Sequence, residues 1–433
     1  MKARFLLQLA AFLAAAATGC DTQEALDLDR SIPFSSHDGF GSMFASLRSS
    51  APLTLLPQDK GDESPACLDG SPYGFYFNKA KTVQGATKWT ISIEGGGWCY
   101  DEDLCLDRAS TNLGSSKHWA KEAGCGCMNA DENGPVEDCN CLYMPYGDGA
   151  SFSGYRSKPW PVPNQPGKTL TFRGIKNLDA TLEWAFANAG LGNATEFVLT
   201  GGSAGGLSTF LHADRVAERV RAGAPRVEKI VAAPVVGYFR DADNYKHTTG
   251  VPDTPTWKQA NYTDWMHYIY TMQNLTFSRR GERAASALAT ECLEKHRSHP
   301  WYCFMSPHMV DVIETPVFVF NSRFDAWQLA NEFQSDWETK DEQAGVIAYG
   351  AAFEKDFRAV SSHEKNGAFI TSCICHGCPW SDASALSIEG VSPWKAYGEW
   401  YTGKARGSHA VHVDTRNPNG GGAITHPACA KFP

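Results

Sequence analysis

The most chemically informative stretch of the sequence is a serine flanked by glycines, Gly201-Gly202-Ser203-Ala204-Gly205. A Gly-x-Ser-x-Gly pattern is typical of a hydrolase nucleophile that sits on a tight turn between a strand and a helix. The glycines matter because a side chain at Gly201 or Gly205 would crowd that turn. The same pattern also occurs by chance in glycine-rich turns, so the flanking residues decide the interpretation.

The residues on each side of Ser203 predict the strand and the helix that such a turn requires. Residues 197–199 are Phe-Val-Leu, which is typical of a buried strand. After the motif, apolar residues recur at helical spacing, namely Leu207, Phe210, Leu211, Val216 and Val220. We therefore interpret Ser203 as a nucleophile. A serine nucleophile needs a base, an acid that orients the base, and hydrogen-bond donors for an oxyanion.

Asp325 is the candidate for the orienting acid. In the α/β-hydrolase arrangement the acid follows the serine in the chain and lies just after a later strand. Residues 316–320 form a continuous apolar run, and Asp325 follows it closely. This places Asp325 at the carboxyl end of a predicted strand, where open α/β sheets bind their ligands. Asp311 and Asp336 are alternatives, but neither follows so clear a strand.

The base must be a histidine that follows the acid. The candidates are His363, His376, His409, His412 and His426. His376 comes soon after the apolar run 368–370 and lies among Cys373, Cys375 and Cys378. A disulfide in that loop would hold the imidazole in place, as a catalytic base requires. The pattern alone favours His376 and leaves the other histidines open.

Backbone N–H groups are the expected oxyanion donors. One comes from the residue after the nucleophile, which is Ala204. The others are expected from a glycine-rich turn after an earlier strand, and Gly96, Gly97 and Trp98 follow the predicted strand 90–93. A plain β-turn is the alternative interpretation of this segment.

The elements that must position these residues alternate between strands and helices. Predicted strands cover 90–93, 197–199, 230–233 and 316–320, and predicted helices cover 175–189 and 207–221. This alternation predicts an α/β fold of the α/β-hydrolase type, with a mainly parallel sheet and helices on both faces. Loop-rich insertions interrupt it at 100–160 and, as a polar and aromatic cap, at 240–310. We expect residues 403–425 to form an irregular tail.

The amino terminus predicts export. A basic start is followed by the apolar stretch 5–17, which is typical of a signal peptide over residues 1–19. Residues 20–65 are polar and predict a loosely packed arm, and the catalytic domain is expected over 66–433. Cys20 lies in a sequence that loosely resembles a lipoprotein cleavage site, so membrane attachment is expected only if Cys20 is lipidated. We expect a monomer.

The composition narrows the partners and the chemistry of the cysteines. The chain has 433 residues, 14 cysteines and a net charge of −9, with scattered basic residues that indicate no nucleic-acid partner. An exported chain favours disulfides over zinc. The Cys-x-Cys pairs at 125–127 and 139–141 and the cysteines at 373–378 leave a zinc alternative open.

Six blocks, in order, resemble the pectin acetylesterases of plants and their animal relative Notum. These blocks are Ile93-Glu-Gly-Gly-Gly-Trp-Cys99, Tyr146-Gly-Asp-Gly-Ala-Ser-Phe-Ser-Gly154, Phe172-Arg-Gly174, Gly202-Ser-Ala-Gly-Gly-Leu207, Asn321-Ser-Arg-Phe-Asp-Ala-Trp-Gln328 and Ser372-Cys-Ile-Cys-His376. The resemblance implies a secreted serine carboxylesterase that needs no cofactor or metal. It implies Ser203, Asp325 and His376 as the catalytic residues. It also implies that Gly97, Trp98 and Ala204 donate to the oxyanion.

Three functions remain open at this point. The first is removal of acetyl groups from a polysaccharide such as pectin, and the second is removal of a longer acyl group from a protein or lipid. The third is a binding protein that keeps the hydrolase fold without activity. The aromatic residues of 256–270 could line a sugar platform or a lipid slot, or could simply pack a core.

Overall fold

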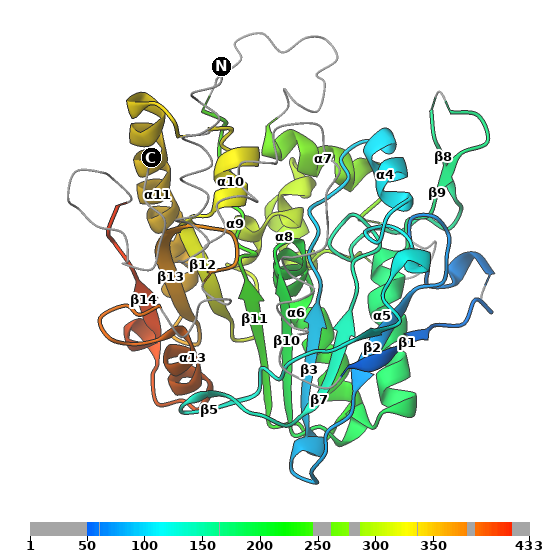
Figure 1. The fold of residues 1–433 in the computed structure, drawn as a ribbon, viewed down its shortest axis with the longest axis horizontal. Helices are drawn as coiled ribbons and strands as arrows, with labels where there is room; N and C mark the ends of the chain where they lie inside the picture. The colour runs from blue at the N-terminus through cyan, green and yellow to red at the C-terminus, as the bar shows by residue number, and fades with distance from the viewer. Residues whose placement is uncertain are drawn as a thin grey trace, which may run out of the picture.

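A ten-stranded sheet forms the centre of the molecule (Figure 1). The computed structural model describes residues 50–59, 61–163, 165–245, 261–276, 286–335, 337–378 and 386–417. Its strands are β1 (Ala51–Leu55), β2 (Gly74–Asn78), β3 (Lys88–Ile93), β4 (Glu122–Ala123), β7 (Asn140–Met144), β10 (Glu196–Gly202), β11 (Lys229–Val235), β12 (Phe318–Phe324), β13 (Gly367–Ile374) and β14 (Val411–Val413). They lie in the order β14-β13-β12-β11-β10-β3-β7-β2-β1-β4.

The strands from β14 to β7 pair in parallel, whereas β2, β1 and β4 add antiparallel pairs at one edge. The mainly parallel sheet predicted from the sequence is therefore confirmed. Parallel pairing also brings the carboxyl ends of β3, β10, β12 and β13 to the same edge of the sheet. All the candidate catalytic segments follow these four strands.

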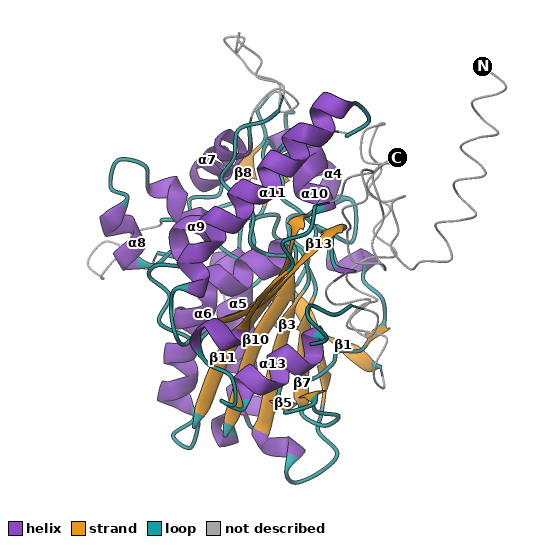
Figure 2. Cartoon of the chain, turned by 90° about the vertical axis from the view of Figure 1, so that its left-hand side faces the viewer, coloured by secondary structure: helices purple, strands orange, loops and turns teal. Residues whose placement is uncertain are grey.

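Helices cover both faces of the sheet, as predicted (Figure 2). Helices α5 (Gly174–Asn188), α6 (Ala204–Gly223) and α11 (Lys340–Ser361) pack on one face, and α13 (Pro393–Tyr401) packs on the other. Strand β10 shows the alternation behind this arrangement. Phe197 and Leu199 point into the larger core, between the sheet and helices α5, α6 and α11. Val198 points into the smaller core on the other face, with Trp400 of α13.

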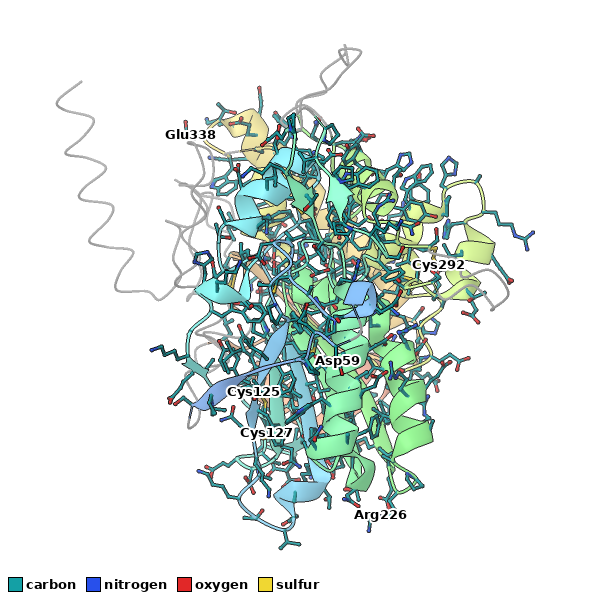
Figure 3. All side chains as sticks on the ribbon, turned by 90° about the vertical axis from the view of Figure 1, so that its right-hand side faces the viewer. Asp59, Cys125, Cys127, Arg226, Cys292 and Glu338 are labelled. Atoms are coloured by element: carbon teal, nitrogen blue, oxygen red, sulfur yellow. A yellow bond between two sulfur atoms is a disulfide. The ribbon has the colours of Figure 1, made fainter. Side chains whose placement is uncertain are left out.

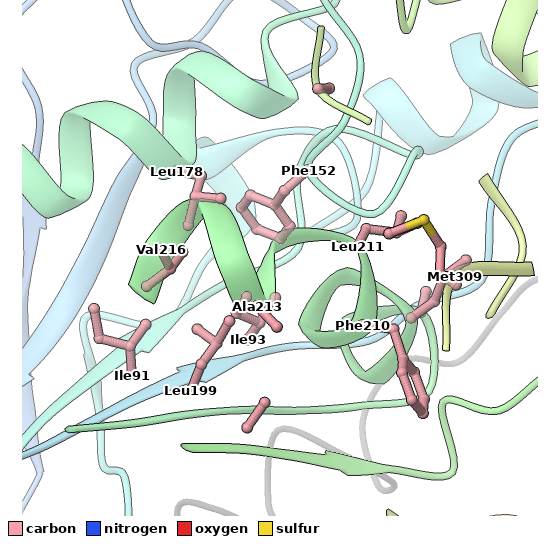
Figure 4. Packing of buried hydrophobic residues seen from close by; sticks show 14 of the residues in the cluster. Ile91, Ile93, Phe152, Leu178, Leu199, Phe210, Leu211, Ala213, Val216 and Met309 are labelled. Carbon is pink, nitrogen blue, oxygen red and sulfur yellow. The ribbon is translucent and has the colours of Figure 1, made fainter. Parts of the chain in front are cut away.

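The larger core lies directly beneath the turn that carries Ser203. Ile91 of β3 and Leu199 of β10 pack there against Leu178 of α5 and Val216 of α6 (Figure 4). These side chains are almost completely removed from water. Such a close-packed base gives the elements around Ser203 little freedom to shift.

Disulfides hold the loop-rich insertion that follows β3. They join Cys99 to Cys105, Cys125 to Cys141 and Cys127 to Cys139. The disulfide between Cys99 and Cys105 lies at the start of α4 (Glu102–Ala109). Figure 3 shows Cys125 and Cys127 on the opposite side of the molecule from Cys292. The cysteines of the two Cys-x-Cys pairs are therefore oxidised, which overturns the zinc alternative at those positions. Cys67 is a buried free thiol.

The segment predicted as a cap contains helical pieces that pack against the larger core. These are α7 (Tyr262–Met272), α8 (Thr290–Lys295), the 3-10 helix η6 (Pro300–Phe304) and α9 (Ser306–Met309), with a disulfide between Cys292 and Cys303. In α7, Tyr262 and Trp265 are buried, whereas Tyr268 is exposed. The first two aromatic residues therefore pack a core. Trp257, from the same predicted aromatic stretch, lies outside the described residues.

Two predictions about the ends of the domain need revision. The sheet extends into the segment predicted as a loose arm, because β1 at 51–55 pairs with β2 and β4. The prediction of an irregular tail is wrong for its first part, which forms η7 (Gly407–Ala410) and β14. β14 pairs in parallel with β13, and Val411 and Val413 pack against the larger core. The polar, glycine-rich composition of the tail concealed this short edge strand.

The predicted signal peptide and Cys20 lie outside the described residues. Within the described ranges, no helix has the length and apolar character needed to cross a bilayer.

Candidate active site

Ser203 lies on a strained turn between β10 and α6. Its backbone has φ 56° and ψ −125°, a left-handed conformation that non-glycine residues rarely adopt. The Ser203 N–H donates to the Val235 carbonyl of β11 at 2.9 Å, which holds the turn against the sheet. Backbone strain of this kind persists only where the surroundings enforce it, and it is typical of a nucleophile turn.

The glycines near Ser203 are required by close backbone contacts. A β-carbon on Gly205 would lie 2.2 Å from the Ile93 carbonyl oxygen of β3. A β-carbon on Gly95 would lie 2.7 Å from Cβ of Ser203. Any side chain at these positions would push the turn after β3 away from the serine.

Asp325 and His376 form a hydrogen-bonded pair at the ends of two neighbouring strands. Asp325 follows β12 and is the N-cap of α10 (Ala326–Asn331), where its Oδ1 accepts from the Gln328 N–H at 3.0 Å. His376 follows β13, and its Nδ1 lies 2.8 Å and 3.0 Å from the two carboxylate oxygens of Asp325. Asp325 is completely buried. The parallel pairing of β12 and β13 therefore brings together two residues that are 51 positions apart.

A disulfide between Cys375 and Cys378 encloses His376 and Gly377. The sulfur atoms of Cys373, Cys375 and Cys378 lie within 4.8 Å of one another. All three cysteines are in disulfides, so their thiolates are not available to a metal.

The alternative residues occupy other places. Asp311 forms an ion pair with Lys295 at 2.7 Å on the surface. His412 lies on the edge strand β14, and His409 is exposed in η7. Asp336 and His426 lie outside the described residues. His376 is thus the candidate histidine for which a hydrogen bond to Asp325 is observed.

The turn after β3 is held from behind by a buried arginine. Nη1 of Arg108, on α4, donates to the Gly96 carbonyl oxygen at 2.5 Å. The C=O and N–H of one trans peptide point in opposite directions, so this bond directs the Gly97 N–H away from Arg108. Gly97 has φ 64°, which suits a residue without a side chain. The sequence assigned no role to Arg108, because its contact depends on the path of the disulfide-closed loop.

Aromatic rings pack beside the imidazole of His376. The ring centres of Phe239 and Trp327 each lie 6.4 Å from that of His376. The ring centre of Trp98 lies 4.8 Å from that of Phe239 and 5.4 Å from that of Trp327, and both pairs pack edge to face. Trp98, which follows β3, therefore lies in the same cluster as the histidine that follows β13. Sequence reasoning missed Phe239 and Trp327, although Trp327 lies in the family-like block 321–328.

Two buried carboxyl groups, Glu94 after β3 and Asp148 after β7, have strongly raised pKa values. Burial raises the pKa of Glu94 to about 7, against the stabilising hydrogen bond that its carboxylate accepts from the Tyr146 N–H. Burial also raises the pKa of Asp148 to about 7, although the N–H groups of Phe152 and Ala150 donate to it. Both side chains support the backbone around the site, and their protonation changes near neutral pH.

This geometry defines a class of protein. A serine on a strand–helix turn of a mainly parallel sheet, with an aspartate–histidine pair at neighbouring strand ends, is characteristic of α/β-hydrolase-like proteins. The solved structure of the Wnt deacylase Notum from Drosophila has the same fold, with a TM-score of 0.67 and 23% identity over 82% of this chain and 94% of that chain.

The chain belongs to the pectinacetylesterase family, whose profile matches residues 45–421. It is similar to pectin acetylesterase 7 of Arabidopsis thaliana, with 28% identity over 378 residues, covering 82% of this chain and 88% of that protein. It is also similar to the palmitoleoyl-protein carboxylesterase NOTUM of Homo sapiens, with 26% identity over 367 residues, covering 82% of this chain and 67% of that protein. The family membership identifies the chain as a carboxylic ester hydrolase.

Proposed function

We propose that the protein hydrolyses O-acyl esters through a covalent acyl-serine intermediate. Ser203 attacks the ester carbonyl while His376 takes the hydroxyl proton. His376 then protonates the leaving alcohol and activates a water molecule that releases the acid. Asp325 orients the imidazole and stabilises its protonated form. The observation that carries this proposal is the hydrogen bond from His376 Nδ1 to the buried Asp325, at the same sheet edge as the strained turn of Ser203.

The proposed oxyanion donors are the backbone N–H groups of Gly97, Trp98 and Ala204. Gly96 contributes its carbonyl to Arg108, and the peptide it shares with Gly97 is thereby fixed in direction. Ala204 is the first residue of α6, so its N–H is not used within the helix. Donors fixed in advance stabilise the developing charge without reorganising during the reaction.

The aromatic cluster favours a short acyl group, chiefly acetyl. Trp98 and Phe239 are almost fully buried and touch each other edge to face beside His376. A long acyl chain could pass between these rings only if they moved apart. We therefore propose an acetylated polysaccharide as the substrate, and similarity to a pectin acetylesterase makes pectin the leading candidate.

A longer acyl group on a protein or lipid is the second candidate. It is supported by similarity to a relative named as a palmitoleoyl-protein carboxylesterase. A binding protein without activity is the third, and the aspartate–histidine hydrogen bond weighs against it. We also propose that the protein is secreted and monomeric. The disulfides support secretion, because such bonds persist outside the reducing cytosol.

Turnover of p-nitrophenyl esters from acetate to palmitate, by wild type and Ser203→Ala, tests the proposal. We expect activity to fall steeply beyond butyrate and to disappear in Ser203→Ala. Ser208→Ala is a matched control, because Ser208 is a buried serine in α6, the helix that follows Ser203. Wild-type turnover by Ser203→Ala would contradict the nucleophile. A preference for long chains would favour the second candidate, and release of acetate from pectin would identify the polymer.

A further inference from the structure

A buried serine outside the proposed triad joins the two backbone segments that carry the proposed oxyanion donors. The indole Nε1–H of Trp98 donates to Oγ of Ser151 at 2.8 Å. The Ser151 hydroxyl in turn donates to the Ala204 carbonyl oxygen at 2.8 Å. A hydroxyl has one proton to donate and lone pairs to accept with, so this arrangement uses it in both roles.

We propose that Ser151 is a positioning residue for the oxyanion donors. It links the turn that carries the Trp98 N–H to the first turn of α6, which carries the Ala204 N–H. Trp98, Ser151 and Ala204 are buried at 2%, 0% and 0% exposure, so water does not compete for this bridge. The inference rests on the proposed acyl-transfer function and adds a residue that acts through its neighbours.

The backbone of Ser151 is itself fixed on three sides. Its N–H donates to the Tyr146 hydroxyl at 3.0 Å, and the next N–H, of Phe152, donates to Asp148 at 2.8 Å. Its carbonyl oxygen lies 3.2 Å from Nε2 of His212, on α6. Burial lowers the pKa of His212 to about 4, so this contact stays uncharged at neutral pH. A hydroxyl on so rigid a support can set the separation of the segments it bridges.

The backbone conformation of this loop would suit glycine at position 151 better than serine, which points to a role for the hydroxyl. Ser151 and Phe152 have φ values of 49° and 59°, in the left-handed region that favours glycine. Glycine at position 151 would relieve this strain but would remove the bridge to Trp98 and Ala204. Strain held in place by surrounding contacts is typical of a functional site.

Two substitutions separate the role of the hydroxyl from its effect on folding. Ser151→Ala and Ser151→Gly both remove the bridge, but glycine suits the left-handed backbone. We expect both to lower kcat for p-nitrophenyl acetate by about 10- to 100-fold with KM within threefold, because displaced donors weaken transition-state binding. Affinity for a boronic acid that forms a tetrahedral adduct with the serine should fall in parallel. The thermal midpoint of Ser151→Gly should stay at or above that of Ser151→Ala.

Ser208→Ala is the matched control. Ser208 is equally buried, on α6, and its hydroxyl makes no hydrogen bond to Ser151 or to either donor segment. We expect its kcat to stay within threefold of wild type. Trp98→Phe removes the other half of the bridge, so Ser151→Ala should have little further effect in that background.

The possible failures can be told apart. If wild type hydrolyses esters and both Ser151 variants keep kcat within threefold, the positioning role is wrong and the proposed function stands. The role is also wrong if Ser208→Ala loses as much activity as Ser151→Gly. If wild type hydrolyses no ester and does not react with a serine-directed phosphonate, the proposed function itself fails.

Discussion

Nδ1 of His376 lies 2.8 Å and 3.0 Å from the two carboxylate oxygens of Asp325, and Asp325 is completely buried. The carboxylate also caps α10 through the Gln328 N–H. One side chain therefore orients the proposed base and fixes the start of the helix that carries Trp327.

Asp325→Asn should remove most of the activity and leave the fold intact. The asparagine carbonyl can still cap α10, but its amide would face Nδ1 of His376 and favour the wrong tautomer of the base. A substitution of this kind in a serine triad typically lowers kcat about 10⁴-fold. Steady-state kinetics with circular dichroism would check this. Asp311→Asn, on the surface, should remain active, and near-normal kcat in Asp325→Asn would contradict the proposed role.

Phe239→Ala should broaden acyl-chain selectivity. The Phe239 ring packs against Trp98 and beside His376, so its removal leaves room where a longer acyl chain could lie. We expect the ratio of octanoate to acetate kcat/KM to rise at least tenfold, since each buried methylene contributes about 0.8 kcal/mol. Phe353→Ala would serve as the control, because Phe353 is buried in the same core and its ring packs against Tyr238 and Phe357. An unchanged ratio would show that the acyl group binds elsewhere.

Asp148→Asn should flatten the dependence of stability on pH. The pKa of Asp148 is about 7 in the folded protein and about 3.8 without the fold, so the folded state binds the proton more tightly. The stability that the protonated Asp148 contributes is therefore fully present below about pH 4. It is lost as the pH rises towards 7, by up to about 1.4 kcal/mol of unfolding free energy per pH unit.

The measurement is the free energy of unfolding by urea at pH 5 and pH 8. Wild type should lose more stability than Asp148→Asn between these values. Asp107→Asn, at an exposed site on α4, should behave like wild type. Equal losses in wild type and Asp148→Asn would mean that Asp148 is ionised throughout.

Removal of the disulfide next to His376 should affect activity more than removal of a distant one. The double variant Cys375→Ala/Cys378→Ala opens the small ring around His376 and leaves no new free thiol. We expect kcat to fall about tenfold, because a catalytic base must be held to about 0.5 Å. Cys292→Ala/Cys303→Ala opens the disulfide of the cap region and should have a smaller effect on kcat. If the two double variants lose kcat equally, the position of His376 does not depend on the disulfide between Cys375 and Cys378.

The sequence predicted the elements whose patterns are strong and local. Phe197 to Leu199 and the apolar run before Asp325 are buried strands, and regular apolar spacing identified α5 and α6. The order Ser203, Asp325, His376 placed the candidates after three strands of one sheet, and their spatial relation followed from parallel pairing.

The parts that could not be predicted depend on tertiary contacts. Arg108 reaches Gly96 only through the path of the insertion, and Ser151 bridges segments 53 residues from it on either side. Left-handed φ values at Ser151 and Phe152 have no signature in residue type. The short strand β14 was hidden because its stability comes from its neighbour β13 and not from its own composition.

Covalent labelling tests the central claim most directly. The intact protein would be treated with a fluorophosphonate probe, digested and mapped by mass spectrometry. We predict one adduct, on Ser203, that forms in wild type and Ser208→Ala and is absent from Ser203→Ala. An adduct on another residue, or none in a protein that still hydrolyses p-nitrophenyl acetate, would contradict the assignment of Ser203 as the nucleophile.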